Sequence, residues 1–244
     1  MSKRQASIAA LLATLIIAVL LLGACSAKVV RGSRSYVTET REVRGFDRVT
    51  LAGSGDVTLI QGERESLTVE TDDNIMPYIT TQVRGNTLTL GAKSGVSLSP
   101  TRLRFALTVV DLEGITITGS GNVTTERLDA DRIEIKITGS GNVRIDGLEA
   151  DRATVEVSGS GNVDLAGTVN ALEITVSGSG NYRGEDLRSE TASVKVTGSG
   201  NATVWATESL DVHLTGSGSA RYYGTPQVNL TGSGSGNVKS LGEK

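Results

Sequence analysis

The stretch IEIKITGSGN at residues 133–142 decides the fold, because it recurs as ATVEVSGSGN at residues 153–162. In both copies, aliphatic and polar residues alternate and then run into a Gly-Ser-Gly motif. Such alternation is the period of a β-strand that buries one face. Each copy therefore predicts a strand that ends in a glycine-rich turn.

Counted without overlap, the Gly-Ser-Gly motif occurs eight times in the chain, first at residues 53–55. The other seven motifs are spaced by 20, 20, 19, 20, 18 and 16 residues and begin at Gly119, Gly139, Gly159, Gly178, Gly198, Gly216 and Gly232. Together the eight motifs hold 16 of the 30 glycines, so glycine here marks fixed positions and not a flexible linker. Self-similarity at a period near 20 residues is the signature of a repeat architecture.

Aligned on the first glycine, the seven units have two aliphatic columns. Two residues before the glycine stand Ile117, Ile137, Val157, Val176, Val196, Leu214 and Leu230. Four residues before it stand Ile115, Ile135, Val155, Ile174, Val194, Val212 and Val228. Five units continue after the motif with Asn122, Asn142, Asn162, Asn181 and Asn201. Like residues at a fixed interval favour strands that stack on their equivalents in successive coils.

We therefore predict an all-β protein, a parallel β-helix or solenoid with coils of about 20 residues. Strands of adjacent coils lie about 4.8 Å apart, so seven coils make a rod of roughly 34 Å. We expect the aliphatic columns to fill the interior, the glycines to supply the positive φ of a sharp corner, and the Asn side chains to form an amide ladder. The alternative is an antiparallel meander, whose hairpins give no reason for a 20-residue period.

Residues 37–118 depart from this period and form an irregular N-terminal region. One unit is recognisable there as VTLAGSGDV at residues 49–57, with Asp at the Asn position. The rest predicts either wider coils or a cap that covers the open end of the rod. We expect residues 94–100 to be a loop.

The first 25 residues are typical of a bacterial lipoprotein signal. Lys3 and Arg4 precede a 15-residue run at 8–22 that is apolar except for one Thr, which is too short to span a bilayer and suits a secretory signal. The run ends in LGAC at residues 22–25, which resembles a lipobox. We therefore predict a signal peptide over residues 1–24, a lipidated tether over 25–42 with the lipid on Cys25, and the solenoid domain over 43–244.

The chain also resembles the head GIN domain family of auto-transporter adhesins, over about residues 43–240. The resemblance rests on GFDRV at 45–49, ESLTVE at 65–70, DN at 73–74 and DLE at 111–113, followed by the repeated GSGN motif. It implies a right-handed β-helical domain on secreted or surface-attached bacterial proteins, with an adhesive role. It supplies no catalytic residue.

Composition excludes several classes of function. The chain has 24 basic and 27 acidic residues and a formal net charge of -3, which gives no case for a nucleic-acid partner. One Cys and one His exclude an internal disulfide and a thiolate cage and disfavour a zinc hydrolase site, so we expect no metal and no cofactor. The Gly-Ser-Gly turns lead into strands, whereas a phosphate-binding loop leads into a helix.

One polar column is the candidate binding face. It stands directly before the glycines and consists of Thr118, Thr138, Ser158, Ser177, Thr197, Thr215 and Thr231. A flat row of hydroxyls suits glycans, the repeat of a partner protein, or ice. The alternative explanation is that Thr and Ser simply have a high β propensity at exposed strand positions.

The sequence thus predicts a non-enzymatic lipoprotein that presents a repetitive surface for adhesion to glycans or envelope proteins. We expect it outside the cytoplasm, held by lipid on the outer membrane if the organism has two membranes. A first alternative is a carbohydrate-active enzyme, because Asp131, Asp151 and Glu190 share a corner position and a glycosidase needs two carboxylates about 5 to 9.5 Å apart. A second alternative is a structural spacer.

Overall fold

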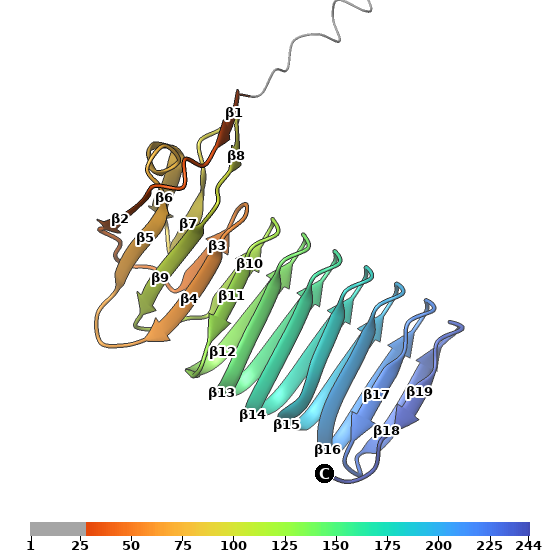
Figure 1. Ribbon diagram of the computed structural model, residues 1–244. Coiled ribbons are helices and arrows are strands. Elements are labelled where there is room, and N and C mark those ends of the chain that lie inside the picture. Colours follow the sequence, from red (N-terminus) through yellow and green to blue (C-terminus); the bar gives the residue numbers. More distant parts are fainter. Residues whose placement is uncertain (1–27) are drawn as a thin grey trace, which may run out of the picture.

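The computed structural model describes residues 28–244, which form a rod of stacked strands with a cap at its N-terminal end (Figure 1). These residues contain no α-helix and one short 3₁₀ helix, η1, at Met76–Tyr78. Within the same range, no helix is long and apolar enough to cross a membrane. The predicted signal peptide over residues 1–24 and the predicted lipid site Cys25 lie outside the described residues.

The rod is built from strands that pair in parallel with their equivalents in the next coil. Ile135 of one coil pairs with Val155 of the next, and Val155 pairs with Ile174. The predicted parallel β-solenoid is confirmed, and the antiparallel meander is excluded. The strands of the rod are β10 (Gly114–Ile117), β11 (Asn122–Thr125), β12 (Leu128–Ile137), β13 (Asn142–Val157), β14 (Asn162–Val176), β15 (Asn181–Val196), β16 (Asn201–Leu214), β17 (Ala220–Tyr223), β18 (Gln227–Gly232) and β19 (Val238–Ser240).

The two aliphatic columns fill the interior of the rod in every coil but the last. Val228 and Leu230 of β18 are 38% and 57% exposed, because no further coil covers them among the described residues. They also pair with Leu210 and Val212, which is a shift of two residues from the predicted alignment. The prediction is therefore wrong for this coil, in which the turn that stacks on residues 216–218 is Gly-Ser-Gly at 234–236.

The glycines of the central turns are required by close approach of successive backbones. A Cβ on Gly159 would lie 1.9 Å from the carbonyl oxygen of Gly139. That same oxygen accepts a hydrogen bond from the Ser160 N–H at 3.1 Å. The expected positive φ occurs in the Gly-Ser-Gly motifs only at Gly53, Gly55 and Gly232, so that expectation is wrong for the central coils.

The Asn side chains form the predicted ladder along one corner. Asn142 donates its amide to Asn122 at 2.8 Å, and Asn162 donates to Asn142 at 2.8 Å. The series continues through Asn181 and Asn201 at 2.9 and 3.0 Å. At the N-terminal end, Asn122 donates to the carboxylate of Asp56 at 2.8 Å, so the ladder reaches into the N-terminal region.

The N-terminal region is a cap. Two of its strands, β3 (Arg48–Leu51) and β4 (Asp56–Gln61), continue the stack by pairing in parallel with β10 and β11. The strands β7 (Thr87–Ala92) and β9 (Leu103–Val109) add one more parallel layer. Antiparallel strands then close the end: β5 (Ser66–Asp72) on β9, β2 (Tyr36–Arg41) on β5, and β6 (Ile79–Arg84) on β7.

Residues before the cap and inside its longest connection are also ordered as strands. β1 (Lys28–Arg31) pairs in parallel with β8 (Val96–Ser99). The expectation of a loop over residues 94–100 is therefore wrong at β8. Of the predicted tether over 25–42, the described part contains β1 and the paired strand β2.

Asp72 is a buried carboxylate that fixes the connection between β1 and β2. It accepts hydrogen bonds from the Arg34 N–H at 2.7 Å, the Thr101 N–H at 2.8 Å and the Thr101 hydroxyl at 2.6 Å. Burial by itself raises the pKa of Asp72, but these hydrogen bonds outweigh it and lower the pKa from 3.8 to about 2. The ionised form therefore holds the cap together.

This shift predicts a loss of stability in acid. Because the pKa of Asp72 is lower in the folded chain, its contribution is complete above pH 4 and is lost as the pH falls toward about 2. We expect the melting temperature, followed by circular dichroism between pH 5 and pH 2, to fall less steeply in Asp72→Asn than in the wild type. Asp151→Asn, at an exposed corner, should keep the wild-type slope. Equal slopes in all three proteins would contradict the assignment.

Tyr182 is the largest side chain buried in the rod, between Val163 and the small Ala202. Its hydroxyl is buried and has no hydrogen-bond partner among the described residues. Burial, and then the negative charge of Glu185, raise the pKa of Tyr182 above its ordinary range. The core therefore carries a polar group that contributes only a desolvation cost.

We expect Tyr182→Phe to stabilise the protein. Removal of the unpartnered hydroxyl should raise the free energy of unfolding by about 1 kcal/mol, or about 2 to 4 °C in melting temperature for a chain of this size. Thermal unfolding measures the effect. Tyr222→Phe, at a partly exposed ring in the same rod, serves as the control and should leave the melting temperature unchanged. A lower melting temperature for Tyr182→Phe would show that the hydroxyl has a bound partner.

Candidate functional site

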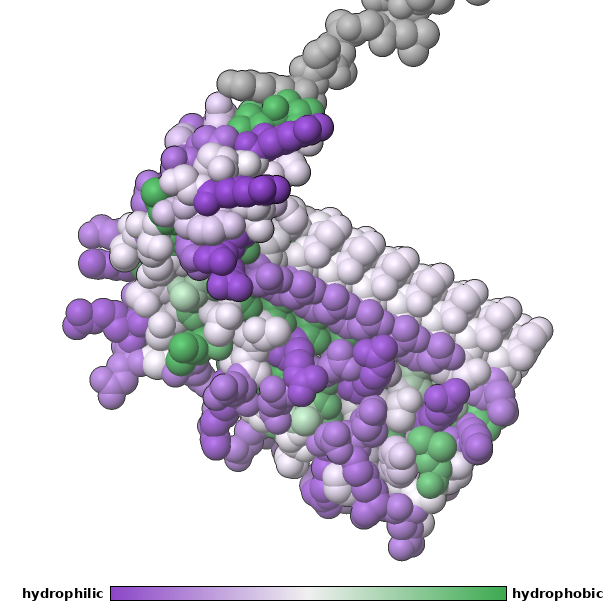
Figure 2. Space-filling view, viewed as in Figure 1, coloured by the Kyte–Doolittle hydropathy of each residue, from purple (hydrophilic) through white to green (hydrophobic). Residues whose placement is uncertain are grey.

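Two rows of exposed hydroxyl side chains flank the stacked glycines. We call these two rows the hydroxyl ridge; Figure 2 shows it as a regular line of near-white residues along the rod. The first row is the predicted column, with members at Thr118, Thr138, Ser158, Ser177, Thr197 and Thr215. The second row is the serine of each motif, at Ser120, Ser140, Ser160, Ser179, Ser199 and Ser217. The ridge is thus twice as wide as the sequence predicted.

Thr231, the last member of the predicted column, does not lie on the ridge. It pairs with His213 on the neighbouring face, where its hydroxyl lies 3.0 Å from the His213 Nδ1. Because of the two-residue shift of the last coil, Gly232 pairs with Leu214. Ser233, the residue after Gly232, is therefore in register with Thr215 of the ridge, in the place predicted for Thr231. Thr231 is therefore removed from the candidate site.

The backbone of the ridge is fixed, and one of its hydroxyls, that of Ser158, donates to the Glu156 carboxylate at 3.4 Å. The Thr138 N–H donates to the Ile117 carbonyl at 2.9 Å, and the Ser158 N–H donates to the Ile137 carbonyl at 2.8 Å. Among the described residues, no hydrogen-bond partner is found for the hydroxyls of Thr118, Thr138, Ser177, Thr197 and Thr215. Coil stacking repeats these groups about every 4.8 Å. The ridge therefore offers rigid, regularly spaced donors and acceptors to a ligand.

The structure also corrects how this column is positioned. It lies at the turn and not on an exposed strand face, because β10 ends at Ile117, one residue before Thr118. The second row had a signal in the sequence, since a serine stands between the glycines of every motif.

The corner carboxylates considered for an enzyme are stacked as predicted. Asp151 and Asn170 occupy equivalent positions, and the Asn170 amide donates to the Asp151 carboxylate at 2.9 Å. Asp131 and Glu190 continue the column in the coils on either side, and all four side chains are exposed. No group of three or more His, Cys, Asp or Glu residues that could hold a metal ion is found within residues 28–244.

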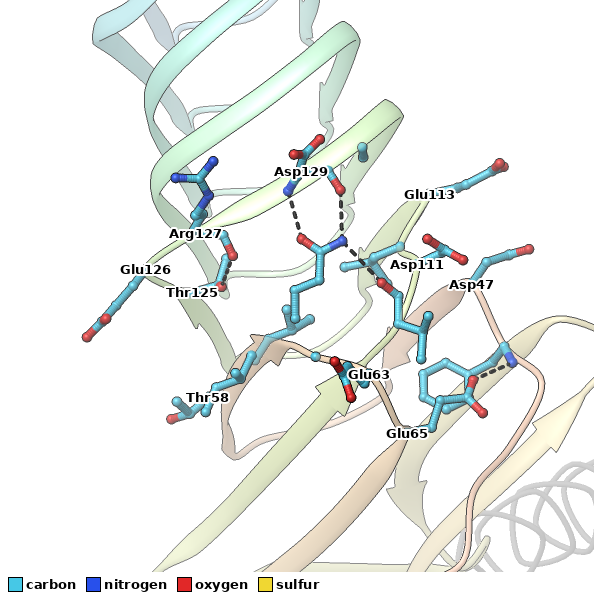
Figure 3. A pocket seen from close by; sticks show the side chains of 18 of the residues that line it. Asp47, Thr58, Glu63, Glu65, Asp111, Glu113, Thr125, Glu126, Arg127 and Asp129 are labelled. Atoms are coloured by element: carbon cyan, nitrogen blue, oxygen red, sulfur yellow. Dashed lines mark hydrogen bonds between the residues drawn. The ribbon is translucent and has the colours of Figure 1, made fainter.

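A cleft lies where the cap meets the rod. We call it the junction cleft; it has a volume of about 1500 Å³ and lies between the end of β4 and the start of β12. Asp47, Glu63 and Asp111 line it from the cap side, and Glu126 and Asp129 line it from the rod side (Figure 3). No pattern in the sequence indicates this cleft, because it forms between segments far apart in the chain.

A family model described as "Putative auto-transporter adhesin, head GIN domain" matches residues 45–226. The chain belongs to this family. The match covers the β3–β4 unit of the cap and the rod up to residue 226, so the resemblance seen in the sequence is confirmed.

Solved structures share the fold of this head GIN domain. A "putative adhesin" from Bacteroides fragilis NCTC 9343 is 29% identical, with a TM-score of 0.83 over 87% of this chain and 100% of that chain. A "Putative lipid binding protein" from Parabacteroides distasonis ATCC 8503 is 26% identical, with a TM-score of 0.76 over 88% and 100%. A "putative adhesin" from Parabacteroides merdae ATCC 43184 is 21% identical, with a TM-score of 0.71 over 88% and 100%. The comparison with curated proteins finds no match.

Proposed function

We propose that this head GIN domain is a non-enzymatic adhesion protein of the bacterial cell envelope, and that its hydroxyl ridge binds glycan. The observation that carries the proposal is the double row of exposed hydroxyls, which have free hydrogen-bonding capacity and a constant spacing. The family and the two structures described as adhesins support an adhesive role outside the cytoplasm. No residue pattern on the ridge supplies a base for a serine nucleophile.

The ridge suits a polysaccharide chain for physical reasons. Ser and Thr side chains are short, so they lose little conformational freedom when a ligand binds. The close-packed turns keep the hydroxyls in place before binding, which lowers the cost of association. A polymer laid along the rod can use several coils at once, so weak contacts at each coil add up.

The lipobox supports the rest of the proposal. A lipid on Cys25 would hold the rod at a membrane surface, and Ser26 favours the outer membrane in an organism with two membranes. The cap, which is nearest to Cys25 in sequence, would then face the membrane. The ridge and the last coil would face outward. Metabolic labelling with an alkyne fatty acid should label the wild type and not Cys25→Ser.

A binding assay with insoluble and immobilised polysaccharides tests the ridge. Three lysines at Ser158, Ser177 and Thr197 should reduce retention of the mature chain at least tenfold, because long charged side chains would cover the ridge. The matched control carries three lysines at Thr154, Glu173 and Ser193, which stack in the same coils on another face. Equal loss in both triple variants would contradict a role for the ridge.

The same assay separates the alternatives. New reducing ends that disappear in Asp131→Asn or Asp151→Asn would replace the proposal with a carbohydrate-active enzyme. If neither retention on polysaccharide nor new reducing ends are detected, the structural spacer is the alternative that remains. Because one similar structure is described as a lipid-binding protein, vesicles of phosphatidylcholine form another arm, since their zero net charge does not attract the added lysines. Retention on vesicles that the ridge variant abolishes would reassign the ridge to lipid.

A further inference from the structure

The first part of β12, residues 128–132, has one free strand edge, and this edge faces the junction cleft. Residues 128–132 of β12 pair with β13 on one side. On the other side, β10 reaches β12 only from Glu134 onward. Among the described residues, no strand covers this second side of residues 128–132. An uncovered edge presents backbone N–H and C=O groups that can pair with an added strand.

The side chain of Gln61 already bonds to this edge. Its Oε1 accepts from the Asp129 N–H at 2.9 Å, and its Nε2 donates to the Asp129 carbonyl at 2.9 Å (dashed lines in Figure 3). The same Nε2 donates to the Val110 carbonyl at 3.1 Å. The Gln61 amide thus bonds to both the N–H and the C=O of Asp129, as a residue of a neighbouring strand does in a hydrogen-bonded pair of an antiparallel sheet. The edge is therefore arranged to receive a peptide group from within the cleft.

The cleft also exposes aliphatic side chains. Ile60 at the end of β4 is 59% exposed and Val110 after β9 is 39% exposed, and both line the cleft. Large apolar side chains of the cap and rod are otherwise mostly buried in the core. Exposed apolar groups beside a strand edge are the surroundings in which added peptides place alternate side chains.

The charge of the cleft is strongly negative. Nine carboxylates and three guanidinium groups line it, which leaves an excess of six negative charges. Each guanidinium already lies near a carboxylate: Arg127 at 3.2 Å from Glu149, Arg132 at 3.7 Å from Glu113, and Arg144 at 2.8 Å from Asp146. The acidic groups are spread along the cleft and do not converge on one point, which suits several cationic side chains.

We propose that the junction cleft binds an extended, lysine- or arginine-rich segment of a partner protein, which adds as a β-strand to residues 128–132. Side chains of a strand alternate between its two sides. One set would contact Ile60 and Val110, and the other would reach the carboxylates. The peptide backbone would take over the Asp129 groups that Gln61 now binds. This site is separate from the hydroxyl ridge and does not depend on the proposed function.

A labelled peptide tests the proposal directly. The probe is fluorescein-labelled Lys-Val-Lys-Val-Lys-Val-Lys, added to the mature chain and followed by fluorescence anisotropy. We expect a dissociation constant in the micromolar range that weakens at least tenfold between 50 and 500 mM NaCl. A peptide with Glu in place of Lys should not bind. A Lys-Val peptide N-methylated at every residue should not bind either, because neither of its edges can donate the strand hydrogen bonds.

Variants locate the site. Ile60→Lys and Asp131→Lys should each weaken binding at least tenfold, while Glu173→Lys, an equal charge change on a distant exposed face, should alter it less than twofold. Gln61→Ala should tighten binding, because it frees the edge. Thermal melts check that each variant is folded. Equal binding of the N-methylated peptide, or equal effects of Asp131→Lys and Glu173→Lys, would overturn strand addition in the cleft.

Discussion

Val155→Asp is expected to abolish folding of the rod or to lower its melting temperature by roughly 10 °C or more. Val155 is 1% exposed and stacks between Ile135 and Ile174 in the apolar interior. A carboxyl group there has no hydrogen-bond partner, so the cost of burying it should exceed about 4 kcal/mol. Thermal unfolding by circular dichroism, or loss of soluble protein, measures the effect.

The neighbouring residue provides the control for this prediction. Glu156 points to the opposite face of the same strand, and its carboxylate accepts a hydrogen bond from Lys136 Nζ at 2.7 Å. Both side chains are partly exposed, so Glu156→Gln should cost less than about 1 kcal/mol. Similar losses of stability in Val155→Asp and Glu156→Gln would mean that the inward and outward faces are assigned the wrong way round.

Gly159→Ala is expected to be nearly as damaging although it adds a single methyl group. The new Cβ would lie 1.9 Å from the Gly139 oxygen and 2.9 Å from the Thr138 oxygen, and these backbone atoms cannot rotate away. The coils would have to separate locally, which breaks the hydrogen bond from Ser160 to Gly139. We expect a loss of about 3 kcal/mol, measured by thermal or urea unfolding.

Two other substitutions separate this steric effect from backbone preference. Ser160→Ala changes an exposed residue in the same turn and should be neutral. Gly85→Ala meets nothing within 4 Å, but Gly85 has a φ of 58°, so it should cost only the left-handed backbone penalty of about 1 to 2 kcal/mol. A milder effect at Gly159 than at Gly85 would contradict the close stacking of the turns.

The interior of the rod could be predicted from the sequence because its rule is local and repeated. Alternation around Ile135 and Val155 identifies the buried face, and the 20-residue period then identifies the neighbour in the next coil. The Asn ladder follows from the same alignment. The register of the last coil was predicted wrongly because GSGSG at residues 232–236 contains two overlapping motifs. Alignment on the first motif places the last strand two residues out of register with the preceding coil. A shift of two residues leaves the alternation of inward and outward side chains unchanged, so the alternation does not reveal the error.

The cap and the junction cleft could not be predicted in the same way. The cap has antiparallel pairs, such as β5 with β9, whose partners have no common period. The cleft depends on the meeting of Gln61 and Asp129, which are 68 residues apart in the chain. The double width of the hydroxyl ridge was visible in the motif itself. It was missed because the motif was considered only as a glycine-rich turn.

The Asn ladder leaves the length of the molecule open to change by duplication. Each Asn amide donates toward the cap, and the series ends on the carboxylate of Asp56, which accepts from Asn122. A duplicated or deleted block of 20 residues within the rod would therefore restore every contact at its borders. Gene rearrangement could therefore lengthen or shorten the rod and its hydroxyl ridge by whole coils, while the cap and the junction cleft stay the same.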